Sequence, residues 1–553
     1  MNKLRSLLIL VILVLSSCNE SKQDITSTLE SINAEDLKQH ISVLASDEFG
    51  GRAPASEGEQ KTINYISGQF SRLGLEPGNN GSWFQEVAMI RLTAEKIMQL
   101  GISGGKGKLG FNSPDDFIGG TPQTNDLIKF DNSEMIFVGY GIVAPEYNWN
   151  DYDGLDVKGK TVVMLVNDPG YATGDTALFT GKAMTYYGRW TYKFEEAARQ
   201  GATAALIIHE TGAAGYPWAV VQNSWSGPQF YLENNEFLGS TLLFKGWLTS
   251  DAAKQLFTVA GVEFEKTVQA AATRGFRAIP LNTSASLQFR NSVEHVKSNN
   301  VAALWKGSDR SDECIIYTAH WDHLGINPDF EGDSILNGAV DNATGIAGLL
   351  GIAKAFTSLP ERQERSILFL AVTAEEQGLL GSEYYARNPI FPLDKTVAEI
   401  NMDALNIFGS TKDMTIVGFG NSQLDDYTIK VLEKYNRYAS PDPTPEKGGY
   451  FRSDHFPFAR KGVPALYLSK GVDNIEHGKE WALAESEKWI SENYHKPSDN
   501  YEPDKWDFKG MTDDIKVIFE VGYDLSMTDD FPEWKSGFPF KPLRDEMMAG
   551  AIK

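Results

Sequence analysis

The sequence predicts an α/β protein whose mixed, mostly parallel central sheet carries helices on both faces. The prediction rests on the second half of the chain, where short apolar runs alternate with amphipathic segments after about residue 290. Strands are expected at CIIYTA, SILFLAVTA, VAEINMD and PALYLS, and helices over residues 342–356 and 424–435. Strands that alternate with helices favour a parallel sheet, because each crossover helix packs against one face of it.

Two further helices are expected near the N-terminus. Their apolar residues recur at helical spacing, at Leu37, Ile41 and Leu44 and then at Ile63, Ile66, Phe70 and Leu73. The segment SDEFGGRAPASEGE between them is rich in glycine, proline and serine, and it is expected to form a loop. These helices belong to the first part of a main domain, which is assigned to residues 34–133.

A second domain is expected to be inserted into the first over residues 134–288. Its sequence changes to short β-rich runs such as MIFVGYGIVA and KTVVMLV, followed by the amphipathic segment YKFEEAARQGA and the apolar run TAALIIHE. This pattern predicts a compact β-rich insert with one or two helices. The chain of 553 residues is long enough for two domains with separate cores.

The first residues have the features of an export signal. Lys3 and Arg5 precede an apolar run at residues 7–15 that is too short to span a bilayer, and LSSC follows, ending at Cys18. This resembles a bacterial lipoprotein signal, which implies a signal peptide over residues 1–17, a lipid on Cys18 and a tether over residues 18–33. The protein is then expected to be exported and anchored to the cell envelope, at its periplasmic face or surface. An ordinary secretory signal is the alternative.

Charge and cysteine content limit the partners. The formal net charge of −23 disfavours nucleic acid and anionic lipid headgroups as binding partners. If Cys18 carries a lipid, only Cys314 remains, so no intramolecular disulfide is expected.

Five side chains are candidate metal ligands: His320, Asp341, Glu376, Asp403 and His495. Three of them stand at or just after the end of an expected strand, in the segments YTAHWD, VTAEEQG and INMDALN. Open α/β sheets bind ligands at the carboxyl ends of their strands, so these residues are expected to meet at one edge. Together they provide ligands for two divalent ions that share one carboxylate.

The roles follow from coordination chemistry. Asp341 is expected to bridge the ions, because it precedes NATG and an apolar helix that anchors it to the sheet. One imidazole and one carboxylate then complete the protein ligands of each ion, and coordination positions remain for water and substrate. His320 and Asp403 are assigned to one ion, and Glu376 and His495 to the other. A water that bridges two ions loses its proton easily, which suits amide hydrolysis.

Two carboxylates are assigned to catalysis without binding metal. Glu375 is adjacent to Glu376 and is expected to act as the general base and then to protonate the leaving amine. Asp322 is expected to accept a hydrogen bond from the imidazole of His320 and so orient it. His323 is expected near the cleft without being a ligand, and His455 is a candidate for stabilising the oxyanion.

The motifs HWD, VDNATG, EE, NMD and YHKPSD, in this order over residues 300–505, resemble the M28 family of co-catalytic zinc peptidases. The segments LASDEFGGRAPASEGE and SDHFPFARKGVPALYLS resemble bacterial members of that family. The insert resembles a protease-associated domain, on the weaker basis of GYGIVAP and KFEEAARQGATAALII. Asn342 stands where some relatives carry a second Asp, but that position is not needed as a ligand.

The resemblance implies a zinc exopeptidase-like fold, with a catalytic domain split between residues 34–133 and 289–553. It implies an aminopeptidase that acts on peptide substrates with two Zn²⁺ ions, although Co²⁺ or Mn²⁺ also fits such ligands. Alternatives are a carboxypeptidase of the same superfamily, for which Arg452 is a candidate cationic clamp, and a cyclising transferase that usually holds one zinc. A degenerate lipoprotein that only binds peptides or glycans is a further alternative.

Overall fold

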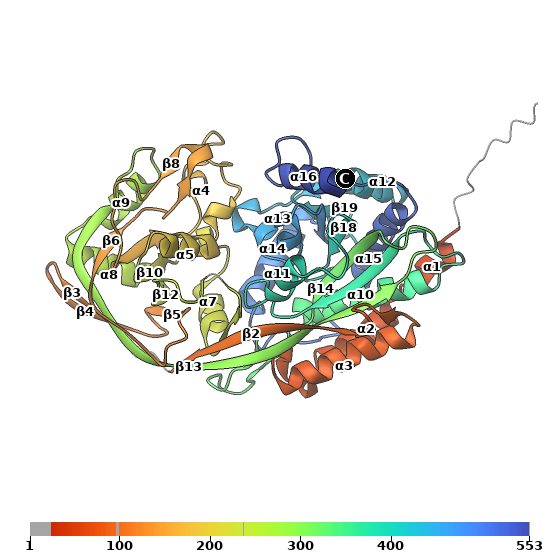
Figure 1. Cartoon of the computed structure of the whole chain (residues 1–553), viewed down its shortest axis with the longest axis horizontal. Helices are drawn as coiled ribbons and strands as arrows, with labels where there is room; N and C mark the ends of the chain where they lie inside the picture. The colour runs from red at the N-terminus through yellow and green to blue at the C-terminus, as the bar shows by residue number, and fades with distance from the viewer. Residues whose placement is uncertain (1–23, 96–98, 236, 552–553) are drawn as a thin grey trace, which may run out of the picture.

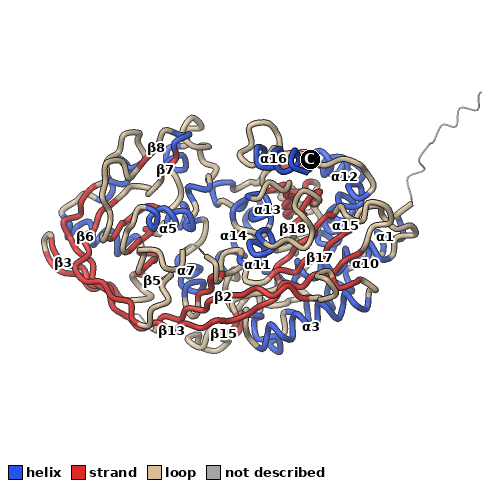
Figure 2. The backbone as a smooth tube through the Cα atoms, viewed as in Figure 1, coloured by secondary structure: helices blue, strands red, loops and turns tan. Residues whose placement is uncertain are grey.

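The computed structural model describes residues 24–95, 99–235 and 237–551, and the chain forms two lobes in it (Figure 1). The predicted signal peptide, residues 1–17, and the predicted lipid site at Cys18 lie outside these residues. Among the described residues, no helix combines the length and apolar character that crossing a membrane requires. Helices and strands alternate through both lobes (Figure 2).

The centre of the larger lobe is a mixed sheet. β14 (Cys314–His320) lies between β17 (Ser366–Val372) and β18 (Thr396–Asn401), and all three strands are parallel. β21 (Ala465–Lys470) continues the sheet parallel to β18. The remaining members at that edge are β19 (Asp413–Val417), antiparallel to β21, and β20 (Tyr438–Pro441), parallel to β19. The predicted mixed, mostly parallel sheet is therefore confirmed.

Both faces of this sheet are covered by apolar helices, as predicted. Ile315 and Tyr317 face a core formed with α2 (Ala34–Leu44), α3 (Glu57–Arg72), α10 (Thr344–Thr357), α12 (Leu424–Lys434) and α15 (Phe508–Ser526). Cys314 and Ile316 face the opposite core, which includes α11 (Leu380–Arg387) and α13 (His455–Arg460). The alternation follows from the two-residue period of a strand. Every residue of β14 is buried, which explains its continuous apolar sequence.

The smaller lobe has its own sheet and core. Its strand order is β4-β3-β13-β6-β9-β10-β12-β5, and β6, β9, β10 and β12 are parallel. The strands are β3 (Gln99–Gly104), β4 (Gly107–Asn112), β5 (Phe117–Gly120), β6 (Leu127–Phe137), β9 (Thr161–Leu165), β10 (Ala204–Ile208) and β12 (Phe244–Leu248). The longer helices are α5 (Trp190–Arg199), α7 (Trp218–Trp225), α8 (Ser250–Ala260) and α9 (Phe264–Ala271). The prediction of one or two helices in this lobe is therefore too low.

Two long strands connect the lobes. β13 (Ile279–Trp305) pairs first with β6 and β3, then with β2 (Phe84–Ala94), and finally with β17. These pairings start the smaller lobe near residue 99 rather than at the predicted residue 134. The predicted end, residue 288, lies inside β13, close to Arg290, where pairing with β6 gives way to pairing with β2. The β3–β4 hairpin is hidden in the sequence because its turn and the start of β4, GKGKLG, have no apolar alternation.

The predicted tether, residues 18–33, is partly folded. α1 (Thr26–Glu30) lies within it, and Thr28 and Ile32 are buried. Ile25 and Leu29 pack against the core of the larger lobe. An extended tether therefore ends before α1.

Two further helices lie near the C-terminus. α14 (Gly478–Glu492) leads into the segment that contains His495, and α16 (Lys541–Ala551) ends the described chain.

Candidate metal centre

Asp341 lies at the centre of the site, just before α10, and only 6% of it is exposed. The carboxylate of Asp499 accepts hydrogen bonds from the backbone N–H groups of Val340 and Asp341, at 3.0 and 3.1 Å. These two bonds fix the turn that aims the Asp341 carboxylate. Asp499 stands four residues after His495 in the chain, so one segment supplies both a candidate ligand and the support of another.

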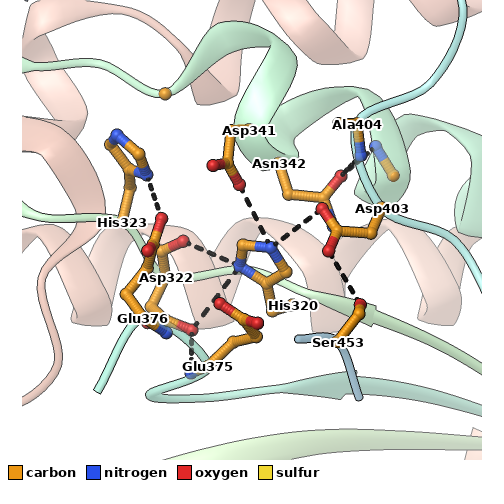
Figure 3. Close-up of polar contacts among 12 residues, drawn as sticks. His320, Asp322, His323, Asp341, Asn342, Glu375, Glu376, Asp403, Ala404 and Ser453 are labelled. Carbon is orange, nitrogen blue, oxygen red and sulfur yellow. Dashed lines mark hydrogen bonds and ion pairs between the residues drawn. The ribbon is translucent and has the colours of Figure 1, made fainter. Parts of the chain in front are cut away.

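One imidazole and one carboxylate face the first oxygen of Asp341 (Figure 3). His320 Nε2 lies 3.2 Å from Asp341 Oδ1 and 3.4 Å from Asp403 Oδ1. His320 is the last residue of β14, and Asp403 follows β18 by two residues, so the parallel pairing of these strands brings them to the same edge. Ser453 Oγ donates a 2.7 Å hydrogen bond to the other oxygen of Asp403 and orients it.

A second imidazole and carboxylate face the other oxygen of Asp341. His495 Nε2 lies 3.5 Å from Asp341 Oδ2 and 3.0 Å from Glu376 Oε2. Glu376 follows β17, the strand beside β14. The structure thus brings together all five residues that the sequence singles out as ligands, in the two groups that were assigned, with Asp341 between them.

The smaller lobe holds His495 in place. Ser224 Oγ is 2.8 Å from His495 Nδ1, and Asn223 Nδ2 donates a 2.7 Å hydrogen bond to the carbonyl oxygen of His495. Both residues lie on α7. The ring of Tyr494 stacks on the imidazole, with 3.9 Å between the centroids. With Nδ1 engaged by Ser224, Nε2 is directed at the two carboxylates.

Asp322 has a different contact from the one expected. His320 Nδ1 is 3.2 Å from the backbone oxygen of Asp322 but 3.9 Å from its carboxylate. The carboxylate instead accepts hydrogen bonds from the backbone N–H groups of Glu375 and Glu376, at 3.0 and 3.4 Å. The side chain turns away from the imidazole because those two N–H groups follow β17 and lie within its reach. Asp322 therefore orients His320 through its backbone and the two glutamates through its side chain, and burial raises its pKa to about 8.

Glu375 lies beside His320 (Figure 3), and its side chain is partly exposed. Burial raises the pKa of Glu375 well above its usual range; the positive charge of His320 opposes this, and the negative charge of Glu376 adds to it. A raised pKa makes the carboxylate a stronger proton acceptor, which suits a general base.

His323, which was expected near the site without being a ligand, is a sixth candidate donor. It is buried, and its Nδ1 lies 2.6 Å from Glu376 Oε1. His323, Asp341 and Glu376 together satisfy the spacing of a three-ligand site. Its position in HWDH, three residues after His320, is the sequence signal that points to it. His455, in contrast, is enclosed by the rings of Tyr450 and Tyr467, at 4.9 and 5.1 Å.

Arg52 connects the N-terminal loop to the site. Its buried guanidinium donates to four backbone oxygens, those of Leu44, Trp321, Asn337 and Gly338. Burial lowers the pKa of Arg52 to about 10, while nearby carboxylates, led by Asp499, oppose the change. The loop GGRAP thus holds in place the segments that lead to His323 and Asp341.

The donor set fits a divalent metal. Glu376 Oε1 and His495 Nε2 are buried, and their close polar neighbours are other candidate ligands, His323 Nδ1 at 2.6 Å and Glu376 Oε2 at 3.0 Å, as expected of donor atoms that converge on a cation. Burial disfavours ionisation of Glu376, but the imidazoles of His495 and His323 outweigh it and lower the pKa to about 2. The pKa of Asp341 is likewise held well below its usual range, because His320 and His495 outweigh burial. Ionised carboxylates with imidazoles are the ligands that zinc binds.

Comparison with known proteins identifies the region that holds the site. Residues 300–517 match the family model described as Peptidase family M28. Over these residues the chain is similar to peptidase family M28. The matched M28 region contains every candidate ligand and Glu375.

Individual relatives agree with this assignment. Aminopeptidase YwaD of Bacillus subtilis (strain 168) is 26% identical over 216 residues, which cover 37% of this chain and 40% of that protein. A probable zinc metalloprotease of Pyrenophora teres f. teres (strain 0-1) is 33% identical over 134 residues, covering 24% of this chain and 25% of that protein. The chain therefore spans less than half the length of these relatives.

The fold extends beyond the M28 region. The structure of an aminopeptidase from Aneurinibacillus sp. strain AM-1 aligns with 92% of this chain and 97% of its own, with a TM-score of 0.54 and 17% identity. At this identity the likeness concerns the fold alone, and it includes the smaller lobe.

Proposed function

We propose that this protein is a zinc-dependent aminopeptidase that hydrolyses the N-terminal residue of peptides. One observation carries the proposal: the two oxygens of Asp341 face two separate groups of imidazole and carboxylate, 3.2 to 3.5 Å away. Such an arrangement suits two ions that share one carboxylate. The names of the M28 relatives, among them an aminopeptidase and a zinc metalloprotease, support the same activity.

The roles of the residues follow from their positions. His320 and Asp403 would hold one ion and Glu376 and His495 the other, with Asp341 shared between them. His323 stands beside Glu376 as a further donor. When bound, the ions polarise the scissile carbonyl and lower the pKa of water.

Glu375 is the proton carrier in this proposal. Its carboxylate takes the proton from the attacking water and later gives it to the amine that leaves. Asp322 holds the backbone of Glu375 through a 3.0 Å hydrogen bond, which fixes the position of the base relative to its ligand neighbour.

The test compares leucine amide with N-acetylleucine amide, with and without a chelator. We expect hydrolysis of the free amine only, loss of that activity with the chelator, and recovery when zinc is restored. Equal hydrolysis of the N-blocked substrate would exclude an aminopeptidase, and activity that survives full removal of metal would exclude the metal mechanism.

We also propose that the protein is exported and anchored to the cell envelope by a lipid on Cys18. The sequence LSSC after a short apolar run supports this. Mass spectrometry of the mature N-terminus provides the test: an unmodified Cys18, or cleavage elsewhere, contradicts the anchor.

A further inference from the structure

Two arginines stand near the metal centre without an acidic partner. Arg189 comes from the smaller lobe, immediately before α5. Arg452 comes from the larger lobe, where it follows the short 3-10 helix Gly449–Phe451. The chain has 74 acidic residues against 51 Lys and Arg, so guanidinium groups without a carboxylate are unexpected at this location.

Arg189 is 8% exposed, and its guanidinium makes no hydrogen bond or ion pair with any residue that the structure describes. Its one recorded side-chain contact is with the ring of Trp190, at 5.8 Å. The other buried arginines of the described chain, Arg52, Arg365 and Arg544, all donate hydrogen bonds. Burial lowers the pKa of Arg189 to about 10, and the charge of Arg452 lowers it further. A buried cation without a partner is costly unless an anion joins it.

Arg452 lies beside both ligand groups. Its Nη2 donates to Tyr494 Oη at 3.3 Å, and the ring of Tyr494 is the one that stacks on His495. The next residue in the chain is Ser453, which binds Asp403. The guanidinium of Arg452 also lies 5.0 Å from the ring of Tyr216 in the smaller lobe. Only one aromatic side chain separates Arg452 from His495.

The two arginines face a common region. Trp190, whose ring the Arg189 guanidinium contacts, packs in the same apolar cluster as Tyr216 and Tyr494, the two aromatic residues that Arg452 contacts. Guanidinium groups from the two lobes that border one cluster suit an anionic ligand, because arginine presents a planar fork of donors to a carboxylate.

We propose that Arg189 and Arg452 form a subsite for a substrate carboxylate that lies one residue from the cleaved bond. The proposal rests on the proposed peptidase function and specifies its substrate class. The carboxylate has two sources: the C-terminal carboxylate of a dipeptide, or the side chain of Asp or Glu next to the cleaved bond. In either case the subsite favours anionic peptides, although the protein itself is strongly acidic.

The test measures kcat/KM for matched neutral and anionic substrates. Leu-Leu and Leu-Leu-amide differ only in the C-terminal charge, whereas Leu-Glu-amide and Leu-Gln-amide differ only in the side-chain charge. We expect the wild-type protein to prefer at least one anionic member by about 10-fold or more, since hydrogen bonds to charged groups contribute that much. A preference within the first pair identifies the C-terminal carboxylate, and one within the second pair identifies the side chain.

The variants R189M and R452M test the residues themselves. We expect each to lower kcat/KM for the preferred anionic substrate by roughly 10- to 100-fold and to leave its neutral counterpart within about threefold. Arg460 provides a matched control, because it is exposed and contacts Tyr186 at the same junction of the lobes. R460M should keep the preference of the wild-type protein, and circular dichroism checks that all variants fold.

Several results would overturn the subsite. The subsite is excluded if the wild-type protein has equal kcat/KM for the neutral and anionic members of both substrate pairs. This result does not depend on whether the variants fold. If R189M and R452M lose kcat/KM equally on neutral and anionic substrates, the arginines have a structural role and do not bind a substrate carboxylate. Failure of the proposed function is a separate result, because it abolishes chelator-sensitive hydrolysis of Leu-Leu-amide as well. The protein could instead hydrolyse N-acetyl-Leu-Leu, with a kcat/KM that falls in R452M. That result would support the subsite but show that the enzyme is a carboxypeptidase.

Discussion

The two lobes hold their buried charges in different ways. The larger lobe collects carboxylates and imidazoles at the carboxyl edge of its sheet, where Asp341, Glu376 and Asp403 converge around His320 and His495. The smaller lobe also buries carboxylates, such as Asp151 and Asp168, but its buried Lys245 lies among aromatic rings: Lys245 Nζ is 4.9 Å from the Tyr231 ring and 5.1 Å from the Trp225 ring.

The two lobes therefore have different roles at the site. The larger lobe supplies the candidate ligands and the base. The smaller lobe positions His495 through Ser224 and Asn223, and it carries Arg189 of the proposed carboxylate subsite. Substitutions in the larger lobe should therefore abolish activity, whereas those in the smaller lobe should alter metal affinity, selectivity or stability.

The largest effect is expected from Asp341→Ala. Because Asp341 faces both ligand groups, its loss should remove bound zinc and reduce kcat/KM by about 1,000-fold or more, as follows from a metal contribution of several kcal/mol. Zinc analysis and leucine amide hydrolysis measure both quantities. The exposed Asp329 in the preceding loop provides the control, since Asp329→Ala should change neither. Activity near the wild-type value in Asp341→Ala would remove the basis for a shared carboxylate.

The second-largest effect on activity is expected from replacing Glu375, the proposed general base. Glu375→Gln should lower kcat by about 100- to 10,000-fold while the zinc content and KM stay close to wild type, because the amide cannot accept the proton. Steady-state kinetics with metal analysis separates these terms, and the exposed Glu331→Gln is the comparison variant. If kcat is unchanged, another group carries the proton.

A smaller effect is expected from the support that crosses between the lobes. Ser224→Ala should weaken zinc binding by about 10- to 100-fold, the usual range for partners that orient a ligand. Competition with a chelating dye measures this affinity. Ser226 follows the same helix and bonds only to the carbonyl of Gln222, so Ser226→Ala is the matched control. Identical zinc affinity in the two variants would show that α7 does not support the site.

The smallest effect on activity is expected from Lys245→Met, which should change the pH dependence of stability. Burial lowers the pKa of Lys245 from 10.5 to about 7. Between these values the unfolded chain binds one more proton than the folded protein, so the free energy of unfolding rises with pH, by at most about 1.4 kcal/mol per pH unit. Urea unfolding from pH 6 to pH 10 should show a shallower rise in the variant. Parallel curves for both proteins would mean that the lysine is not desolvated.

The ligand set was predictable because its signals are local. Asp403 and Glu376 each follow an apolar run, and parallel strands bring the ends of such runs to one edge. The contacts that cross between lobes have no such signal: nothing near Ser224 indicates that it meets His495, which is 271 residues away. The role of Asp322 was only half predictable, since its carboxylate accepts hydrogen bonds from two backbone N–H groups at 3.0 and 3.4 Å, whereas the imidazole of His320 lies 3.9 Å away.

In the fold, too, the elements with a local apolar pattern were the predictable ones. α2 and α3 match their apolar periodicity, and the strands of the larger lobe match their apolar runs. The start of the smaller lobe is different, because β3 and β4 form a largely exposed hairpin that buries few side chains and therefore has little apolar pattern. α14 was also missed, since Ala482 is its only buried residue and a helix that buries so little has no apolar stripe.

Anomalous diffraction at the zinc edge, on crystals of the zinc-loaded protein, tests the central claim most directly. The account predicts two zinc peaks about 3.5–4 Å apart. Asp341 should lie between them, with His320 and Asp403 at one peak and Glu376 and His495 at the other. A single zinc ion at full occupancy, or ions bound away from Asp341, would contradict it.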